Sequence, residues 1–390
     1  MLKKRGFEKG SPADVVIVNT CAVTAEAGRK SRQLINRLKA ENPGALLAVC
    51  GCYSQAEEIE ADIVFGTNDK EAFAEAIEKG VRERNVDDPF KRLEFEELPA
   101  GAVDGRTRAM LKIQDGCVNF CSYCIIPYTR GRLRSLSIEK AAAETERIAA
   151  EGFKELVITG IEIASYGLDL PGKPKLEDVL CACSEKAGDM RIRLGSLEPR
   201  AVTEEFCEKL ARCGNFCNHF HLALQSGCDR TLKAMNRKYS CDEFLEVCYR
   251  IRKYFPDCGL TCDLITGFPG ETEEDFEQTL EFIRKCAFSG MHIFPYSRRP
   301  GTPADRMSGQ CSNAVKNGRA KRAIEAAEQM RKEFMESFVG KELEVLAEKG
   351  GKGHSSNYLS VVIKGQWAVN ELMRVKIEGI EGENLYGTCV

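Results

Sequence analysis

Three cysteines within eight residues constrain this chain more than any other feature. They lie in the run Gln114-Asp-Gly-Cys117-Val-Asn-Phe-Cys121-Ser-Tyr-Cys124, with the spacing C-x3-C-x2-C, after an apolar stretch at 109–113 that predicts a strand. Thiolates on one short loop can each bind a different iron of a cubane iron–sulfur cluster. A closed electron-transfer cluster has four such ligands, so three leave one iron open for chemistry.

Two other uses of three cysteines fit this loop less well. A structural zinc site takes four ligands, usually from paired C-x2-4-C motifs, and the nearby sequence offers neither a second motif nor a histidine. A disulfide loop would leave one thiol over. The spacing therefore favours an open iron–sulfur cluster.

From residue 110 to about residue 298, apolar runs alternate with helical patterns. Six βα units predict a parallel, incomplete (β/α)6 barrel with its chemistry at the carboxyl rim of the strands. A rim glycine permits close backbone approach, and a rim carboxylate could bind hydroxyls or an amine. The candidate rim residues are Gly160, Glu162, Ser196, Glu198, Gln225 and Asp263.

Two further groups of polar residues have alternative interpretations. His219 and His221 share one face of a predicted strand, and without a third ligand nearby they indicate a packed or hydrogen-bonded pair rather than a metal site. Arg130, Arg132 and Arg134 alternate in a predicted extended stretch. They would either meet RNA phosphates or form a solvated charged loop.

Residues 1 to about 84 alternate strand and helix, which predicts an α/β domain. The runs at 14–19 and 45–50 are continuously apolar, as expected for parallel strands covered on both faces. Cys21 and Cys52 follow these strands, where α/β sheets build their sites. Cys50 still belongs to the apolar run and is predicted to be a packed core thiol.

The C-terminal part changes character. Residues 85–107 are polar and turn-rich, which predicts a linker, and from about residue 339 short alternating strands follow, separated by glycine-rich turns at 350–353 and 379–382. This pattern predicts a small closed β-barrel. The expected domains are 1–95, 96–335 and 336–390.

Composition limits the class of protein. The 390 residues are 43% hydrophobic, enough for a sizeable core, and contain no apolar run of the roughly 18 residues that span a membrane. Many of the 19 cysteines, such as Cys207, Cys241, Cys248 and Cys286, are isolated in helical patterns, which fits a reducing cytoplasm. The net charge of −3 means that any RNA must bind through a local basic face.

The motif Cys117-x3-Cys121-x-Tyr123-Cys124 resembles the signature of radical S-adenosylmethionine (SAM) enzymes. The wider chain resembles their methylthiotransferase branch, in particular the tRNA N6-threonylcarbamoyladenosine methylthiotransferases. Asn19-Thr-Cys21-Ala-Val-Thr24 and Gly51-Cys52-Tyr-Ser-Gln55 look like the second and third cysteine motifs of that family. The C-terminal strands resemble the TRAM module, an RNA-binding barrel.

The resemblance implies a mechanism. Cys117, Cys121 and Cys124 would hold a [4Fe-4S] cluster whose open iron is chelated by SAM, with Tyr123 and the rim residues as cofactor contacts. An electron from flavodoxin or ferredoxin would cleave SAM, and the 5′-deoxyadenosyl radical would remove hydrogen from C2 of the adenosine at position 37 in a tRNA anticodon loop. A second SAM would supply the methyl group.

Cys21 and Cys52 would hold a second [4Fe-4S] cluster that supplies the sulfur. The family's first cysteine motif should precede Asn19 by a few dozen residues, and this sequence begins too late to contain it. We interpret this as a late start site or a truncated gene model.

Other functions remain open at this point. The isopentenyladenosine branch and the ribosomal-protein branch of the family use the same cysteine spacing. An RNA-binding iron–sulfur protein without sulfur-insertion activity is an alternative from another class. The rim motifs favour an enzyme, because a pure binder has no need of SAM contacts.

Overall fold

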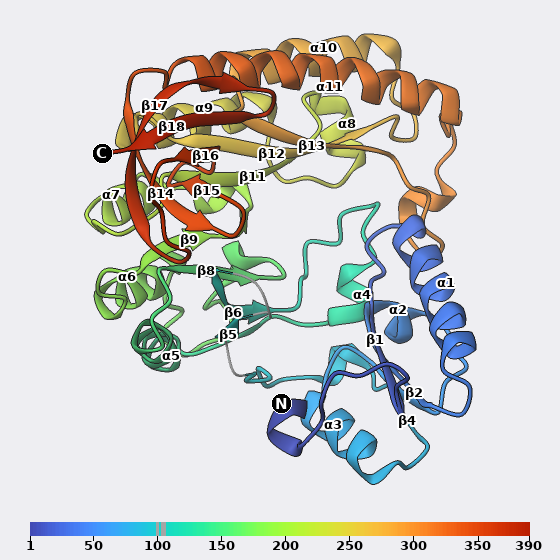
Figure 1. Cartoon of the computed structure of the whole chain (residues 1–390). Coiled ribbons are helices and arrows are strands. Elements are labelled where there is room, and N and C mark those ends of the chain that lie inside the picture. Colours follow the sequence, from blue (N-terminus) through green and yellow to red (C-terminus); the bar gives the residue numbers. More distant parts are fainter. Residues whose placement is uncertain (99–100, 103–106) are drawn as a thin grey trace. The chain divides into compact units, whose positions relative to one another are not determined.

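The computed structural model describes residues 1–98, 101–102 and 107–390 (Figure 1). The chain forms two compact units: unit 1 contains Met1–Glu96, Gly116–Arg132 and Ser297–Arg306, and unit 2 contains Glu97–Asp115, Leu133–Tyr296 and Met307–Val390. Part of the predicted linker at 85–107 lies outside the described residues. Its described part includes the end of strand β4 (Glu83–Asn85) and the short strand β5 (Gly101–Ala102).

Unit 1 is built on a four-stranded parallel sheet in the order β1-β2-β3-β4. Apolar residues cover both faces of its second strand: Val49 packs with Ile35 of the first helix, and Cys50 packs with Phe73 of the third. Cys50 is thus a core thiol, as predicted. The remaining elements are β1 (Val15–Thr20), α1 (Ala25–Glu41), β2 (Leu46–Gly51), α2 (Cys52–Ala56), β3 (Ile63–Phe65) and α3 (Lys70–Lys79).

One prediction for this sheet is wrong. Strand β1 was expected to be covered on both faces, but Ile17 is 38% exposed. Side chains alternate along a strand, so Val16 and Val18 point to the face that packs with Ile35 of α1 and Ile17 points to the opposite face.

Unit 2 contains the predicted parallel barrel strands in sequence order. β6 pairs with β8 and β8 with β9, while β10, β11, β12 and β13 form a second parallel run. Only Gly195 separates β9 from β10, so one chain segment contributes to both sheets. The strands are β6 (Ala109–Asp115), β8 (Glu155–Gly160), β9 (Arg191–Leu194), β10 (Ser196–Leu197), β11 (His219–Gln225), β12 (Gly259–Thr266) and β13 (Gly290–Pro295).

The alternation of side chains explains how these strands divide polar from apolar residues. Along β11, Phe220, Leu222 and Leu224 are fully buried, while the alternate positions His221 and Gln225 are only half-buried. The helices of this unit are α5 (Ile138–Ala150), α6 (Leu176–Lys186), α7 (Glu204–Ala211), α8 (Asp229–Ala234), α9 (Cys241–Tyr254), α10 (Glu273–Cys286) and α11 (Asn313–Glu336). No helix among the described residues is long and apolar enough to cross a membrane.

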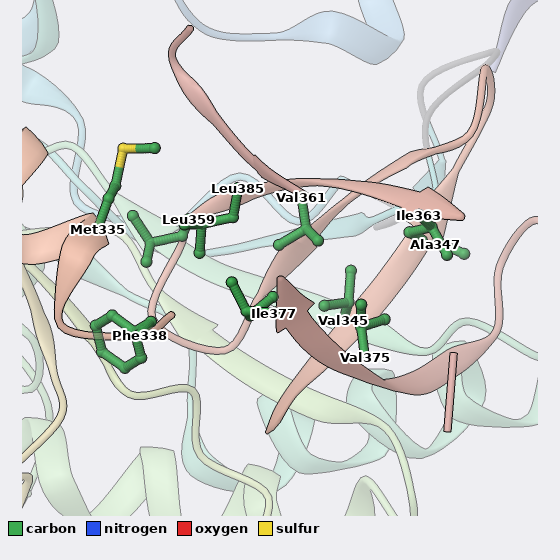
Figure 2. Close-up of a cluster of buried hydrophobic side chains, with 10 residues drawn as sticks. All are labelled: Met335, Phe338, Val345, Ala347, Leu359, Val361, Ile363, Val375, Ile377 and Leu385. Carbon is green, nitrogen blue, oxygen red and sulfur yellow. The ribbon is translucent and has the colours of Figure 1, made fainter. Parts of the chain in front are cut away.

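The C-terminal strands close into a five-stranded barrel in the order β14-β15-β16-β18-β17, which confirms the predicted small barrel. Figure 2 shows its apolar core, in which Val345, Val361 and Val375 meet. The strands are β14 (Glu342–Glu348), β15 (Lys352–Ser355), β16 (Ser360–Lys364), β17 (Leu372–Glu381) and β18 (Asn384–Cys389).

The predicted turn at 350–353 is too long, because β15 already begins at Lys352. A Cβ on Gly353 would lie 2.3 Å from the carbonyl oxygen of Leu346 on β14. Gly353 is therefore required because β14 and β15 approach closely at this residue. The predicted turn was too long because this glycine was assigned to the turn rather than to the strand.

Candidate active site

The three cysteines lie on the loop between β6 and the short helix α4 (Ile126–Arg130). Cys117 and Cys121 are buried and Cys124 is half-buried. The Cys117 N–H donates to the Gly131 carbonyl at 3.1 Å, so both ends of the loop are joined. Gly116 has φ +81°, and a Cβ there would lie 1.8 Å from the Arg132 carbonyl oxygen, so only glycine fits this crossing.

Three other segments of unit 1 hold the loop. The Thr67 hydroxyl donates to the Thr129 carbonyl at 2.8 Å, and the Ala304 N–H donates to the Ser122 carbonyl at 2.8 Å. A Cβ on Gly131 would lie 2.0 Å from the Pro89 carbonyl oxygen. The thiols therefore sit on a backbone fixed by residues far away in the sequence.

The donor set of this loop is three thiols, the ligand type that holds iron–sulfur clusters. A zinc ion needs its ligands to meet at one point, whereas a cubane takes each thiolate at a different corner. Cys117, Cys121 and Cys124 are the thiols that could hold such a cluster.

Cys21 and Cys52 follow β1 and β2, whose last residues, Thr20 and Gly51, are register partners. Cys21 is exposed and Cys52 is buried. Cys52 belongs to an apolar cluster with Ala22 and Tyr53, and Ile125 packs against it. The residue after Cys124 thus contacts the cluster of side chains that contains Cys52.

Sequence reasoning missed Arg299, which is buried in unit 1. Burial lowers the pKa of its guanidinium, although the thiols of Cys21 and Cys52 act in the opposite direction. One of its N–H groups donates to the Thr24 carbonyl at 3.2 Å.

In unit 2, Gly160 and Glu162 follow β8 and are positioned by Gln114 of β6. A Cβ on Gly160 would lie 2.9 Å from the Gln114 Cβ, and the Gln114 Oε1 accepts the Glu162 N–H at 2.8 Å. Burial raises the pKa of the Glu162 carboxyl to about 7, although the Ser165 hydroxyl donates a hydrogen bond to it. The nearby carboxylate of Glu198 acts in the same direction as burial.

Glu198 is buried and forms an ion pair with Arg237, whose Nη2 lies 2.6 Å from its Oε2. Arg237 also donates to the Ala223 carbonyl of β11 at 2.9 Å, which fixes its position. Gln225, at the end of β11, has φ +66°. Glu162, Glu198 and Gln225 therefore come from the ends of three strands of one unit.

Ser196 and Asp263 line a separate part of the same unit. Ser196 is exposed, and the Asp263 Oδ2 lies 3.3 Å from the His221 Nε2. His219 and His221 both hydrogen-bond the Thr261 hydroxyl at 2.9 Å, which confirms the predicted hydrogen-bonded pair. Tyr123, on the cysteine loop of unit 1, is half-buried.

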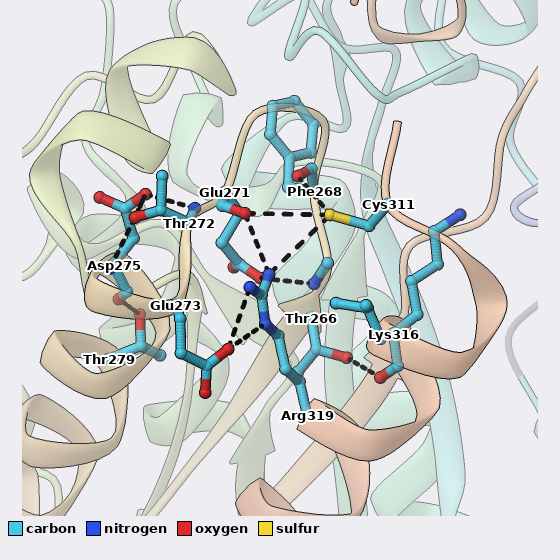
Figure 3. A network of polar contacts seen from close by, with 12 residues as sticks. Thr266, Phe268, Glu271, Thr272, Glu273, Asp275, Thr279, Cys311, Lys316 and Arg319 are labelled. Carbon is cyan, nitrogen blue, oxygen red and sulfur yellow. Dashed lines mark hydrogen bonds and ion pairs between the residues drawn. The ribbon is translucent and has the colours of Figure 1, made fainter. Parts of the chain in front are cut away.

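The turn after β12 is held by a network centred on Arg319 of α11 (Figure 3). The Arg319 guanidinium lies 2.7 Å from the Glu271 carboxylate, which accepts the Gly267 N–H at 2.7 Å. The Thr272 hydroxyl accepts the Asp275 N–H at 3.2 Å, as part of a capping box at the start of α10. This network fixes the turn from Gly267 to the start of α10.

The interpretation of the three arginines as an extended basic stretch is wrong. Arg130 is the last residue of α4, and only Arg132 is exposed. Arg134 is buried and pairs across the β6–β7 ladder with Asp115, its Nη2 lying 3.6 Å from the Asp115 Oδ1; β7 is Arg134–Ser135. Arg134 is thus a structural residue rather than an RNA contact.

Two family profiles match the chain: that of the radical SAM superfamily matches residues 111–283, and that of uncharacterized protein family UPF0004 matches residues 1–69. A Bacillus subtilis protein, threonylcarbamoyladenosine tRNA methylthiotransferase MtaB, is 38% identical over 97% of this chain and 89% of its own length. A tRNA-2-methylthio-N(6)-dimethylallyladenosine synthase of Pelotomaculum thermopropionicum is 38% identical over 89% of this chain and 80% of its own length.

Among solved structures, the radical SAM methyltransferase TsrM from Kitasatospora setae, with cobalamin and a [4Fe-4S] cluster bound, has a TM-score of 0.57. It is 18% identical and covers 86% of this chain and 68% of that chain. At this identity the likeness concerns the fold, and it confirms a radical SAM architecture.

Proposed function

Since this chain belongs to the radical SAM tRNA methylthiotransferase family, we propose that it converts N6-threonylcarbamoyladenosine at position 37 of tRNA to its 2-methylthio derivative. The similarity to the Bacillus subtilis enzyme over 97% of the chain carries this proposal. The second candidate is the dimethylallyladenosine branch, called the isopentenyladenosine branch above. A member of this branch is also 38% identical to this chain, over 89% of the chain's length.

The cysteine loop supplies the residues for the reaction's cofactor. In the proposed enzyme Cys117, Cys121 and Cys124 hold a [4Fe-4S] cluster and leave one iron for SAM. When bound, the cluster supplies the electron that cleaves SAM reductively. Gly116 and Gly131 support this role, because they fix the backbone that carries the thiols.

The rim of unit 2 supplies contacts for SAM itself. We assign Gly160, Glu162, Ser196, Glu198, Gln225 and Asp263 to this role, together with Tyr123 of the loop. Glu162 and Glu198 are suited to the cationic amine of SAM. The Glu162 carboxyl, with a pKa of about 7, would gain a counter-ion when the amine binds. Gly160 leaves room for close backbone approach.

Cys21 and Cys52 are proposed ligands of a second [4Fe-4S] cluster. Their positions after two adjacent strands support this role. Such a cluster would supply the sulfur.

The remaining assignments concern the whole protein. We propose a methylthiotransferase domain at 1–95, a radical SAM domain at 96–335 and a TRAM-like RNA-binding domain at 336–390, the last supported by the closed barrel. The tRNA anticodon loop would be the macromolecular substrate and a flavodoxin or ferredoxin the electron donor. These partners place the enzyme in the cytoplasm.

Nucleoside mass spectrometry of tRNA from cells lacking the gene tests the proposal. We expect the 2-methylthio adduct of threonylcarbamoyladenosine to disappear and the unmethylthiolated nucleoside to accumulate. Loss of the adduct on dimethylallyladenosine instead would assign the chain to the other branch. No loss of either adduct would leave a binding protein.

Complementation with variants connects this result to the loop. Cys117→Ala should fail to restore the adduct and, in purified protein with dithionite, should produce no 5′-deoxyadenosine. Cys241→Ala is the matched control, because Cys241 is a half-buried cysteine at the start of α9. It should restore the adduct fully.

A further inference from the structure

A cavity of about 630 Å³ lies in unit 2 between strands β9–β13 and the C-terminal barrel. All four histidines of the chain line it: His219, His221, His292 and His354. Ser196 and Asp263, which were predicted as site residues, line it as well. The cavity thus includes two of the six rim positions that the proposed function assigns to the active site.

Most charges that line this cavity are neutralised within the protein. Arg108 and Arg193 both pair with the buried Glu155, their Nε atoms each lying 2.8 Å from its Oε1. Asp263, the one acidic residue of the lining, lies 3.3 Å from the His221 Nε2. These contacts leave no excess of negative charge on the cavity wall.

Arg331 of α11 differs from the other lining arginines. It makes no ion pair with any described residue, and its Nη2 donates only to the Glu383 carbonyl, at 3.1 Å. Its Nε is buried without a hydrogen-bond partner. A Cβ on Gly290, at the start of β13, would lie 3.6 Å from the Arg331 Nη1. The guanidinium therefore packs against the strand at a glycine.

One part of the wall is formed by stacked planar side chains. The Tyr358 ring stacks on His219 at 4.7 Å and lies 5.1 Å from the His354 ring. Arg193 lies 4.8 Å from the same tyrosine ring. Such a wall suits a flat, conjugated polar group, and the guanidinium with an unused donor suits an anion.

The two substrates named for the relatives differ in this property. A threonylcarbamoyl substituent carries a carboxylate, a hydroxyl and a planar urea-like group, whereas a dimethylallyl substituent is apolar and carries no charge. An apolar group would leave the Arg331 guanidinium desolvated without a partner, which costs free energy. The cavity therefore distinguishes the two candidates of the proposed function.

We propose that this cavity receives the N6 substituent of the target adenosine and that the Arg331 guanidinium binds its carboxylate. The inference rests on the proposed function, because it assigns a substrate group to the same active site. Arg331 is then the residue that determines specificity for an acidic substituent.

Binding of modified anticodon stem-loop RNAs to the full-length, reconstituted protein tests this role. We compare RNAs that carry threonylcarbamoyladenosine, dimethylallyladenosine or unmodified adenosine at the same position. Arg331→Met should weaken binding of the threonylcarbamoyl RNA about tenfold to a hundredfold, the range for one charge-assisted hydrogen bond. Its binding of the other two RNAs should be unchanged, and Arg331→Lys should retain most of the preference.

Lys332→Met is the matched control, because Lys332 is exposed on the same helix and should not alter any of the three affinities. In turnover, Arg331→Met should raise KM for the threonylcarbamoyl tRNA more than it lowers kcat. His292→Leu is a second variant, at an exposed lining position where folding is not at risk, and it should shift the preference toward the dimethylallyl RNA.

The outcomes separate the inference from the proposed function. If the unaltered protein prefers the threonylcarbamoyl RNA and both variants keep that preference, the inference is overturned and the function stands. If the unaltered protein prefers the dimethylallyl RNA, the proposed function is wrong and the inference fails with it.

Discussion

Glu155 is the first residue of β8, and Glu162 lies two residues past the end of the same strand. The protein shifts the pKa values of these two carboxyls in opposite directions. Glu155 begins β8 and is fully buried, with the Arg191 Nε 2.5 Å and the Arg193 Nε 2.8 Å from its carboxylate. Burial alone would raise its pKa, but the arginines lower the pKa to about 2. Beyond the carboxyl end, burial raises the pKa of Glu162 to about 7.

The surroundings of the two carboxylates explain why their pKa values differ. At the amino end, Arg193 also donates to the carbonyl of Ser356 in the C-terminal barrel at 2.9 Å, so the charge cluster joins two parts of unit 2. At the carboxyl end, the Ser165 hydroxyl donates a hydrogen bond to the Glu162 carboxylate. The first carboxylate stabilises the fold, and the second is the one proposed above to bind the amine of SAM.

The largest expected effect comes from removing the charge at the amino end. Glu155→Gln leaves Arg193 buried without its counter-ion and leaves Arg191 with only the exposed Glu344, at 3.6 Å, which should lower the free energy of unfolding by about 3–5 kcal/mol. Chemical denaturation measures this change. Glu151→Gln, an exposed residue on the preceding helix, should change stability by less than about 0.5 kcal/mol. Equal effects of the two variants would contradict the structural role of Glu155.

Removing the charge at the other end should affect binding instead. Glu162→Gln should not lower the free energy of unfolding, because burial disfavours the ionised carboxylate that it removes, and it should weaken SAM binding about tenfold at pH 8. Equilibrium binding to anaerobically reconstituted protein measures the affinity. Glu208→Gln, exposed on α7, should bind SAM normally. Unchanged affinity in Glu162→Gln would remove this carboxylate from the cofactor site.

The smallest expected effect is the pH dependence of stability, which should have opposite signs at the two ends. The lowered pKa of Glu155 contributes stability that is present above about pH 4.5 and is lost as the pH falls toward 2. The raised pKa of Glu162 contributes stability that is present below about pH 4.5 and is lost as the pH rises toward 7.

Unfolding experiments across pH, on the two glutamine variants and the unaltered protein, measure these slopes. Glu155→Gln should lose the acidic slope only, and Glu162→Gln should lose the slope between about pH 4.5 and 7 only. If one variant removed both slopes, the two carboxylates would be coupled rather than independent.

Local patterns predicted most of the fold and part of the site. The βα order of unit 2 was predictable, because the apolar runs of β11 and β12 stop where these strands stop. The capping box at Thr272 was also predictable, because its two residues are three positions apart.

Residues whose roles depend on distant contacts could not be found this way. Arg299 lies next to Cys21 and Cys52, and its hydrogen bond to Thr24 spans 275 positions. Arg331 gives no local signal either, since it lies in a helix of mixed charge that predicts a solvated face. Only the fold shows that one arginine of this helix reaches a cavity.

Unit 1 is built from three separate segments of the chain, and this limits how the protein can be truncated or its domains exchanged. A shortened version with residues 97–390 would keep Cys117, Cys121 and Cys124 but lose Thr67 and Pro89, against which their loop is built. Swapping the first hundred residues between relatives would succeed only if the incoming segment preserved that supporting surface. An exchange must therefore carry the segment with Thr67 and Pro89 and the loop with Cys117, Cys121 and Cys124 together.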